Sequence, residues 1–137
     1  MTRRVSRVAV LGVALVASAL AALAQTAPFD FTGHWTGSAT GGKGQTAPLA
    51  ADLTAGTLPR TFTGTLTLTV QGQSGQCPVS GRLRRNDKVR ARVAPCPIGV
   101  ILLHGKLDPT AQTITGHYLN VRKGKVHTGP FMLMKGA

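Results

Sequence analysis

Apolar and polar residues alternate along most of this chain with the period of two that is typical of β-strands. The segment 60–71 is the clearest case, because Phe62, Leu66 and Leu68 share one face while threonines occupy the other. One buried and one solvated face is typical of an antiparallel strand. The alternation, interrupted by turn residues, predicts eight strands at residues 30–39, 46–54, 60–71, 76–84, 88–95, 99–107, 112–122 and 125–135.

Glycines recur on the apolar face of these strands. Phe62-x-Gly64-x-Leu66 and Ile114-x-Gly116-x-Tyr118 are two examples of the pattern. A glycine inside a strand costs stability, so its repetition indicates the tight bends or close packing that a small closed sheet needs. Together with short turns and no long crossover segment, this predicts an all-β fold. We expect an antiparallel up-and-down eight-stranded barrel, with a two-sheet β-sandwich as the alternative.

Two hairpins have a register that can be counted from their turns. If Lys123-Gly124 is a two-residue turn, Tyr118 lies opposite Gly129, and Gly116 lies opposite Phe131. Each aromatic ring would then cover a glycine across the ladder, which recovers packing lost at that glycine.

The second hairpin bears on the two cysteines of the chain. A three-residue loop at 85–87 places Val79 opposite Val93 and brings Cys77 close to Cys96, near prolines that end the ladder. In an exported chain, such a pair is most simply a disulfide. Closing a loop of about 20 residues would add roughly 3 kcal/mol in the chain-entropy model. We expect no metal at this pair, because further ligands are missing nearby.

The N-terminal residues have the pattern of a secretory signal peptide. A basic start precedes the apolar run 8–23, and Ala22-Leu23-Ala24 is a small-x-small cleavage site. A membrane anchor is the alternative, but the run is about 16 residues, short of the ~20 that a spanning helix needs. We therefore expect a cleaved signal at 1–24, a single β-barrel domain at 25–137, and a periplasmic or extracellular location.

The charge balance is strongly basic. Removing the three arginines of the signal would lower the formal net charge from +12 to +9, and the chain contains no glutamate. Five cations share the non-apolar face of the hairpin at 76–95, namely Arg82, Arg84, Lys88, Arg90 and Arg92. They are candidate anion-binding residues, since like charges facing each other are unfavourable until a ligand neutralises them. The alternative is that they only solvate an outer face. Without aromatics among them, sequence-specific nucleic-acid binding is not expected.

A resemblance to a known family rests on the first strand. Phe31-Thr32-Gly33-His34-Trp35 contains a Gly-x-Trp motif, which resembles the first-strand signature of the calycin superfamily of lipocalins, fatty-acid-binding proteins and avidins. The resemblance implies that Trp35 plugs one end of an up-and-down barrel. It also implies that a basic residue, Lys135 or Arg122, packs over this tryptophan.

The resemblance implies a lipocalin-like protein that holds a small apolar or amphipathic ligand. The candidate lining residues are Phe31, Trp35, Phe62, Leu66, Leu68, Ile114, Tyr118 and Phe131. In a barrel this small, the same side chains can instead form a solid core. Two other functions remain open: a basic surface module for an anionic envelope polymer (acidic glycan, lipopolysaccharide or nucleic acid) or a membrane surface, or a purely structural envelope protein.

Catalytic groups are sparse and scattered. The four carboxylates, Asp30, Asp52, Asp87 and Asp108, fall in turns or near strand ends. Aspartates at such places usually serve local hydrogen bonding. The histidines form no spacing typical of a metal site, and no serine lies in a nucleophile-elbow context. We therefore expect a non-enzymatic protein without cofactor or metal.

Overall fold

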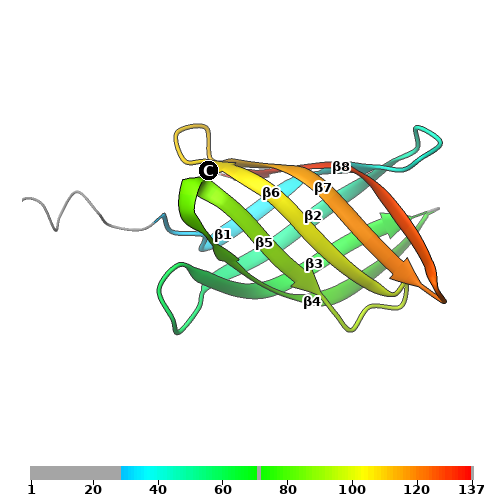
Figure 1. Cartoon of the computed structure of the whole chain (residues 1–137), viewed down its shortest axis with the longest axis horizontal. Coiled ribbons are helices and arrows are strands. Elements are labelled where there is room, and N and C mark those ends of the chain that lie inside the picture. Colours follow the sequence, from blue (N-terminus) through cyan, green and yellow to red (C-terminus); the bar gives the residue numbers. More distant parts are fainter. Residues whose placement is uncertain (1–28, 71, 137) are drawn as a thin grey trace, which may run out of the picture.

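The computed structural model describes residues 29–70 and 72–136. The predicted signal peptide at 1–24 lies outside them. The strands are β1 (Gly33–Thr40), β2 (Thr46–Ala55), β3 (Thr61–Val70), β4 (Gln73–Leu83), β5 (Lys88–Val93), β6 (Val100–Asp108), β7 (Thr113–Arg122) and β8 (Lys125–Lys135). They form one antiparallel barrel in sequence order, closed by the pairing of β1 with β8 (Figure 1). The predicted barrel is confirmed, and this closure excludes the sandwich.

The registers counted from the two turns are confirmed. Tyr118 pairs with Gly129 and Gly116 with Phe131 in the β7–β8 ladder. In the β4–β5 ladder, Val79 pairs with Val93. A single-turn 3-10 helix at Arg85–Asp87 forms the predicted three-residue loop. Local turn chemistry and the alternation of apolar residues therefore agree, which fixes each strand with its apolar side inward.

Three strand ends differ from the prediction by two or more residues. β4 begins at Gln73 rather than at 76, because Gln73 still pairs with Val70 across a tighter turn than the glycines suggested. β5 ends at Val93, two residues before Pro95, which has no backbone N–H for a ladder bond. β1 begins at Gly33, so Phe31 lies before the strand although its side chain is buried.

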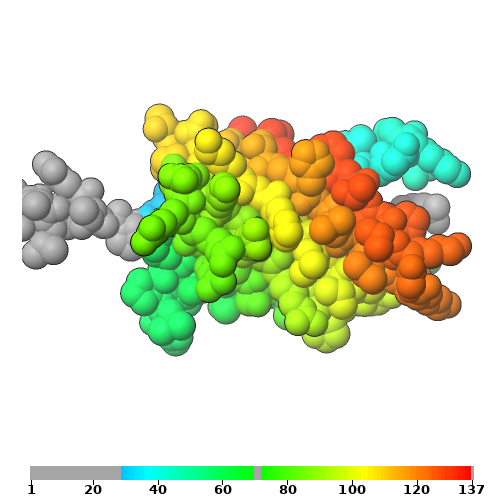
Figure 2. All heavy atoms as spheres, viewed as in Figure 1, coloured from blue at the N-terminus to red at the C-terminus, as the bar shows by residue number. Residues whose placement is uncertain are grey.

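The up-and-down order gives the barrel two different ends. One end holds the segment before β1, the β2–β3, β4–β5 and β6–β7 loops, and the residues after β8. We call it the closed end. The other end holds the β1–β2, β3–β4, β5–β6 and β7–β8 loops, and we call it the open end. In Figures 1 and 2 the β1–β2 loop (cyan) and the tip of the β7–β8 hairpin (orange) project separately at the open end.

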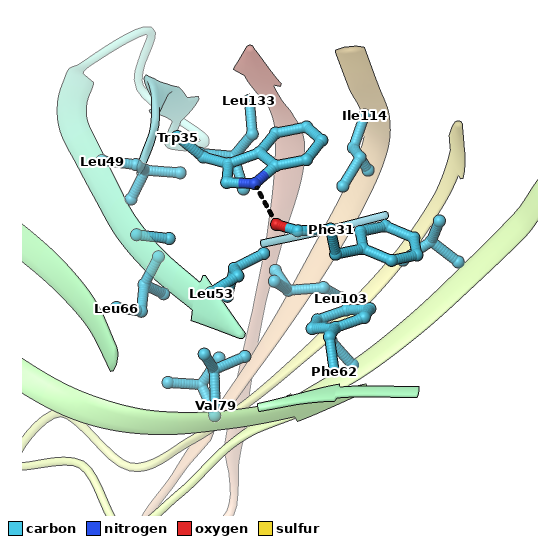
Figure 3. Close-up of a cluster of buried hydrophobic side chains, with 14 of the residues drawn as sticks. Phe31, Trp35, Leu49, Leu53, Phe62, Leu66, Val79, Leu103, Ile114 and Leu133 are labelled. Atoms are coloured by element: carbon cyan, nitrogen blue, oxygen red, sulfur yellow. Dashed lines mark hydrogen bonds between the residues drawn. The ribbon is translucent and has the colours of Figure 1, made fainter. Parts of the chain in front are cut away.

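Aromatic side chains fill the closed end. Trp35 is fully buried, and its indole Nε1–H donates a hydrogen bond of 2.9 Å to the carbonyl oxygen of Phe31 (Figure 3). The Phe31 ring lies 6.1 Å from the Trp35 ring and 4.5 Å from the Phe62 ring, between centroids. Buried indole N–H groups need such a partner, and the rings supply the largest buried apolar surfaces in the chain. This cluster shuts one end of the barrel.

The glycines on the inner face permit close contact between strands. A Cβ at Gly64 of β3 would collide with the backbone carbonyl oxygen of Asp52 on β2. A Cβ at Gly116 of β7 would likewise collide with the carbonyl oxygen of His104 on β6. These two positions therefore require glycine for steric reasons, as expected where a small barrel coils strongly.

Candidate functional site

The open end contains a mostly apolar cavity of about 390 Å³. Its walls are mostly inward-facing side chains from the parts of the strands that lie near the open end. It reaches the rim at Gly41 and Gln45 of the β1–β2 loop and Ile98 of the β5–β6 loop. Deeper in the barrel lies a void of about 20 Å³, lined by apolar residues such as Phe62 and Val79. The interior is thus packed at one end and hollow at the other.

The structure divides the eight predicted lining residues between the two ends. Leu66, Leu68, Tyr118 and Phe131 line the cavity. The other four, Phe31, Trp35, Phe62 and Ile114, are buried in the closed end, where they pack against each other and their neighbours, as Figure 3 shows. They do not line the 390 Å³ cavity.

Several cavity residues were not predicted. The walls also include Ala39, Ala47, Leu49, Ile98, Ile101, Leu103 and Asn120. A partial signal is side-chain size: Ala39, Ala47 and Leu49 occupy inward positions near the open end, whereas Trp35 and Phe62 fill the closed end, although Tyr118 and Phe131 also line the cavity. Smaller inward side chains leave more space inside a barrel of fixed strand number.

Two polar groups lie in this apolar wall. Tyr118 donates a hydrogen bond of 3.0 Å from its hydroxyl to the carbonyl oxygen of Thr40, which fixes its ring across the cavity. Asn120 has a buried side-chain oxygen without a hydrogen-bond partner among the described residues. Such a group is costly when it stays unpaired. Rotation of the Asn120 amide by half a turn would exchange the positions of its oxygen and its N–H₂ group, so that a donor would lie where the acceptor is now.

The rim of the open end is basic. Arg122 and Lys125 are on the same face of the β7–β8 hairpin as Tyr118, which is the inner face of the barrel. Lys123 lies in the turn of this hairpin. The Cβ of Arg122 lies beside Gly99 of the β5–β6 loop, 3.1 Å from where a Cβ on that glycine would be.

All four aspartates lie in the other half of the barrel. Asp30 precedes β1, Asp52 is near the end of β2, Asp87 is in the β4–β5 loop and Asp108 ends β6. The cations of the rim therefore have no carboxylate near them within the described residues.

The five predicted anion-binding residues lie together on the outer wall. Arg82, Arg90 and Arg92 occupy exposed positions of β4 and β5, and Arg82 pairs directly with Arg90. Arg84 and Lys88 flank the β4–β5 loop, where the Arg84 backbone N–H donates to the carbonyl oxygen of Lys88 at 2.6 Å. Within the described residues the only salt bridge is elsewhere, between His34 and Asp52.

The closed end shows what holds Trp35 in place. Lys135 pairs with Trp35 across the β1–β8 ladder, and its Nζ donates a hydrogen bond of 2.9 Å to the carbonyl oxygen of Asp30. The same Nζ lies 5.5 Å from the centre of the Phe29 ring, a cation–π distance. Of the two cations predicted to pack over Trp35, Lys135 lies at the same end of the barrel as Trp35. The prediction of Arg122 for this role is wrong, because the up-and-down order of the strands puts Arg122 at the opposite end of the barrel.

A disulfide joins Cys77 of β4 to Cys96 of the β5–β6 loop, as predicted, with 5.1 Å between the two Cα atoms. Cys77 is fully buried on the inner face, two residues from Val79. The bridge ties the loop that borders the cavity to the wall of the barrel. It therefore limits how far Ile98 can move from the rim.

The polar side chains near the strand ends serve local structure. The backbone N–H of Thr32 donates a hydrogen bond of 2.9 Å to Asp30, and this bond lowers the pKa of the Asp30 carboxyl. The exposed pair of His34 Nδ1 and Asp52 Oδ1 is 2.7 Å apart. No group of three or more metal-ligating side chains lies within residues 29–70 and 72–136.

Over the same described ranges, no helix has the length and apolar character to cross a bilayer. No family model and no curated protein shows significant similarity to this chain.

Proposed function

We propose that this chain is an exported, non-enzymatic binding protein of lipocalin-like plan, which holds a small amphipathic ligand in the cavity at the open end. The observation that carries the proposal is the apolar cavity of about 390 Å³ in an otherwise packed barrel. This volume is within the range of about 300–1,000 Å³ that small-molecule sites occupy. A void of this size lined by leucine and isoleucine is costly to leave unfilled, and a hydrocarbon chain would fill it.

The polarity of the rim supports an anionic head on that ligand. An apolar tail inside would place its head beside Arg122 and Lys125, in a region without aspartate. Charge-assisted hydrogen bonds to such cations are the stronger ones, and the Asn120 amide offers one further polar group inside the wall.

Two features support export and the family relation. The Cys77–Cys96 disulfide is typical of oxidising compartments outside the cytosol. The closed eight-stranded barrel with Trp35 buried at one end has the plan that the Gly-x-Trp motif implied. Membership of the calycin superfamily is therefore part of the proposal.

The test is competition between two anionic amphiphiles for the cavity. We would titrate the protein with the fluorescent probe anilinonaphthalene sulfonate and then displace it with dodecanoate. The variant Ala47→Phe places a ring in the cavity wall near the rim. The matched control Ala50→Phe puts the same ring on the outer face of the same strand, β2, opposite Thr36 and Thr67.

The proposal predicts saturable displacement by dodecanoate in the natural protein and in Ala50→Phe. Ala47→Phe should bind dodecanoate at least about tenfold more weakly, because the ring occupies the volume that the tail needs. Equal affinity of the two variants, or no displacement in the natural protein, would overturn the proposal.

A further inference from the structure

The outer wall of the barrel carries a row of basic groups that runs across four adjacent strands. Arg82 of β4 pairs with Arg90 of β5, and Arg90 pairs in turn with His104 of β6. His104 pairs with His117 of β7. All four side chains are exposed and point away from the core. Directly opposed residues on neighbouring strands lie about 5 Å apart, so the row is a continuous line of regularly spaced donors.

A second row runs beside the first. Lys88 of β5 pairs with Lys106 of β6, and both are exposed. On the other side of the first row lies Arg92. Like charges opposite each other are unfavourable in a sheet, and within the described residues none of these cations forms a salt bridge that would offset the repulsion. An arrangement that costs stability in the free protein is stabilised when an anion neutralises it.

An open groove of about 530 Å³ lies over this wall. The β2–β3 loop, through Thr57 and Leu58, forms one side of the groove, and Arg82, Arg90 and His104 form the other. The wall belongs to the strands β4 to β6 that face the viewer in Figure 2 (green to yellow). The groove is outside the barrel and shares no lining residue with the cavity at the open end.

We propose that this wall, which we call the basic wall (Arg82, Lys88, Arg90, Arg92, His104, Lys106 and His117), binds a linear acidic glycan, with one segment of the chain seated in the groove. Its regular rows of cations match a polymer that repeats carboxylate or sulfate groups along a flexible chain. A flexible chain can follow a convex wall, whereas a flat bilayer or a rigid nucleic-acid duplex touches a convex wall along a short line only. Single-stranded nucleic acid is disfavoured because no phenylalanine, tyrosine or tryptophan of the described residues is exposed on this wall for base stacking.

The two histidines make this binding dependent on pH. Histidine gains its positive charge in the range between about pH 8 and pH 5. His104 is faced by Arg90 from β5 and by His117 from β7, with Lys106 on its own strand and Lys88 and Arg92 diagonally across. His117 is faced by His104 and, from β8, by Pro130. A bound polyanion favours the charged form of any histidine that it contacts, so the polymer should bind more tightly as the pH falls.

The experiment measures binding of a fluorescent heparin oligosaccharide at low salt, at about pH 7.5 and about pH 5.5. A second arm uses polygalacturonate, which separates carboxylate recognition from sulfate recognition. The test variants are Arg82→Gln/Arg90→Gln and His104→Gln/His117→Gln. The matched control is Lys123→Gln/Lys125→Gln. It removes the same number of positive charges as the arginine variant, but at the rim of the cavity.

We expect the natural protein to bind more tightly at the lower pH and more weakly as salt rises. Arg82→Gln/Arg90→Gln should weaken binding roughly tenfold or more, and the control should weaken it by less than about threefold. His104→Gln/His117→Gln should leave binding at the higher pH unchanged and abolish the gain at the lower pH.

Three results would overturn the inference. An equal loss in the control and in the arginine variant would mean that only net charge matters. If the histidine variant still bound the glycan more tightly at the lower pH, the two histidines would not be the cause of the pH dependence. Equal or tighter binding of a single-stranded thymidine oligonucleotide, or of vesicles of anionic phospholipid, would mean that the wall does not select a glycan.

Discussion

The two ends of this barrel are built from the same strands in the same alternation, yet one is packed and the other is hollow. At the closed end Phe31, Trp35 and Phe62 meet with ring centres 4.5–6.1 Å apart. At the open end Ala47 and Leu68 face a cavity of about 390 Å³. Inward phase alone therefore does not decide whether a position lies in the packed core or on the cavity wall, because Leu107 and Leu68 have the same side chain and differ only in depth along the barrel.

Charge follows the same division. The four aspartates of the chain lie in the closed half, and the open rim carries Lys43, Arg122, Lys123 and Lys125 without a carboxylate among the described residues. The carboxylates therefore gather where the barrel is closed, whereas cations lie at both ends, as Arg84 and Lys88 beside the β4–β5 loop show.

A matched pair of leucine truncations compares the ends directly. Leu107 is almost fully buried in the closed end, whereas Leu68 lines the cavity. Leu107→Ala should lower the free energy of unfolding by about 3–5 kcal/mol, because it opens a void in a packed region. Leu68→Ala should cost less than about 2 kcal/mol, since its side chain already borders empty space. Urea unfolding measures both, and equal costs would contradict the division.

The disulfide is expected to give the next largest effect. It closes a loop of sequence separation 19. Cys77→Ala/Cys96→Ala should therefore lower the free energy of unfolding by about 3 kcal/mol, mainly through the unfolded chain. The same urea experiment with and without reductant measures this cost. Identical stability of the reduced and oxidised natural protein would show that the bridge contributes nothing.

The rim cations should affect affinity rather than stability. Arg122→Gln/Lys125→Gln should weaken dodecanoate binding by about tenfold, which corresponds to about 1.4 kcal/mol. Binding of dodecanol, which has the same tail and no charge, should not change. Calorimetric titration of both ligands measures the contrast. An equal loss for the alcohol would mean that the substitutions disturb the cavity instead of removing a head-group contact.

The smallest effect concerns Asp30 at the closed end. The Thr32 backbone N–H lowers the pKa of this carboxyl, so the ionised form is favoured in the folded protein. The contribution is present above the ordinary value of 3.8 and is lost as the pH falls through the lowered pKa. Asp30→Asn should therefore make stability slightly less sensitive to acid below about pH 4. Thermal unfolding at stepped pH values compares the two proteins, and parallel curves would remove Asp30 from the acid response.

Periodicity and turn chemistry predicted much of the fold, and the reason is local. The alternation over Phe62 to Leu68 and the Lys123-Gly124 turn each specify a strand face or a register without knowledge of the rest of the chain. The strand ends were less accurate, because Gln73 is held in β4 by its partner on β3 and not by its own propensity.

The site was predicted less completely, because depth along the barrel is not a local property. Leu68 and Ile114 have the same inward phase, yet only Leu68 lines the cavity. Likewise His104 and Lys106 join the basic wall only because β6 lies beside β5, which follows from the order of strands in the closed barrel. The alternation within one hairpin indicates its own row of cations but not their neighbours on the next strand.

The central claim is that the open end binds a ligand while the closed end does not take part. An NMR titration of the isotope-labelled protein with dodecanoate, kept below its micelle concentration, tests it most directly. The chain has one tryptophan, so the indole N–H of Trp35 gives a single signal from the closed end. The account predicts saturable shifts for the amides of Ala47, Leu68 and Asn120 and an unmoved Trp35 indole signal. No shift at the open end, or a Trp35 signal that moves with the largest amplitude, would contradict it.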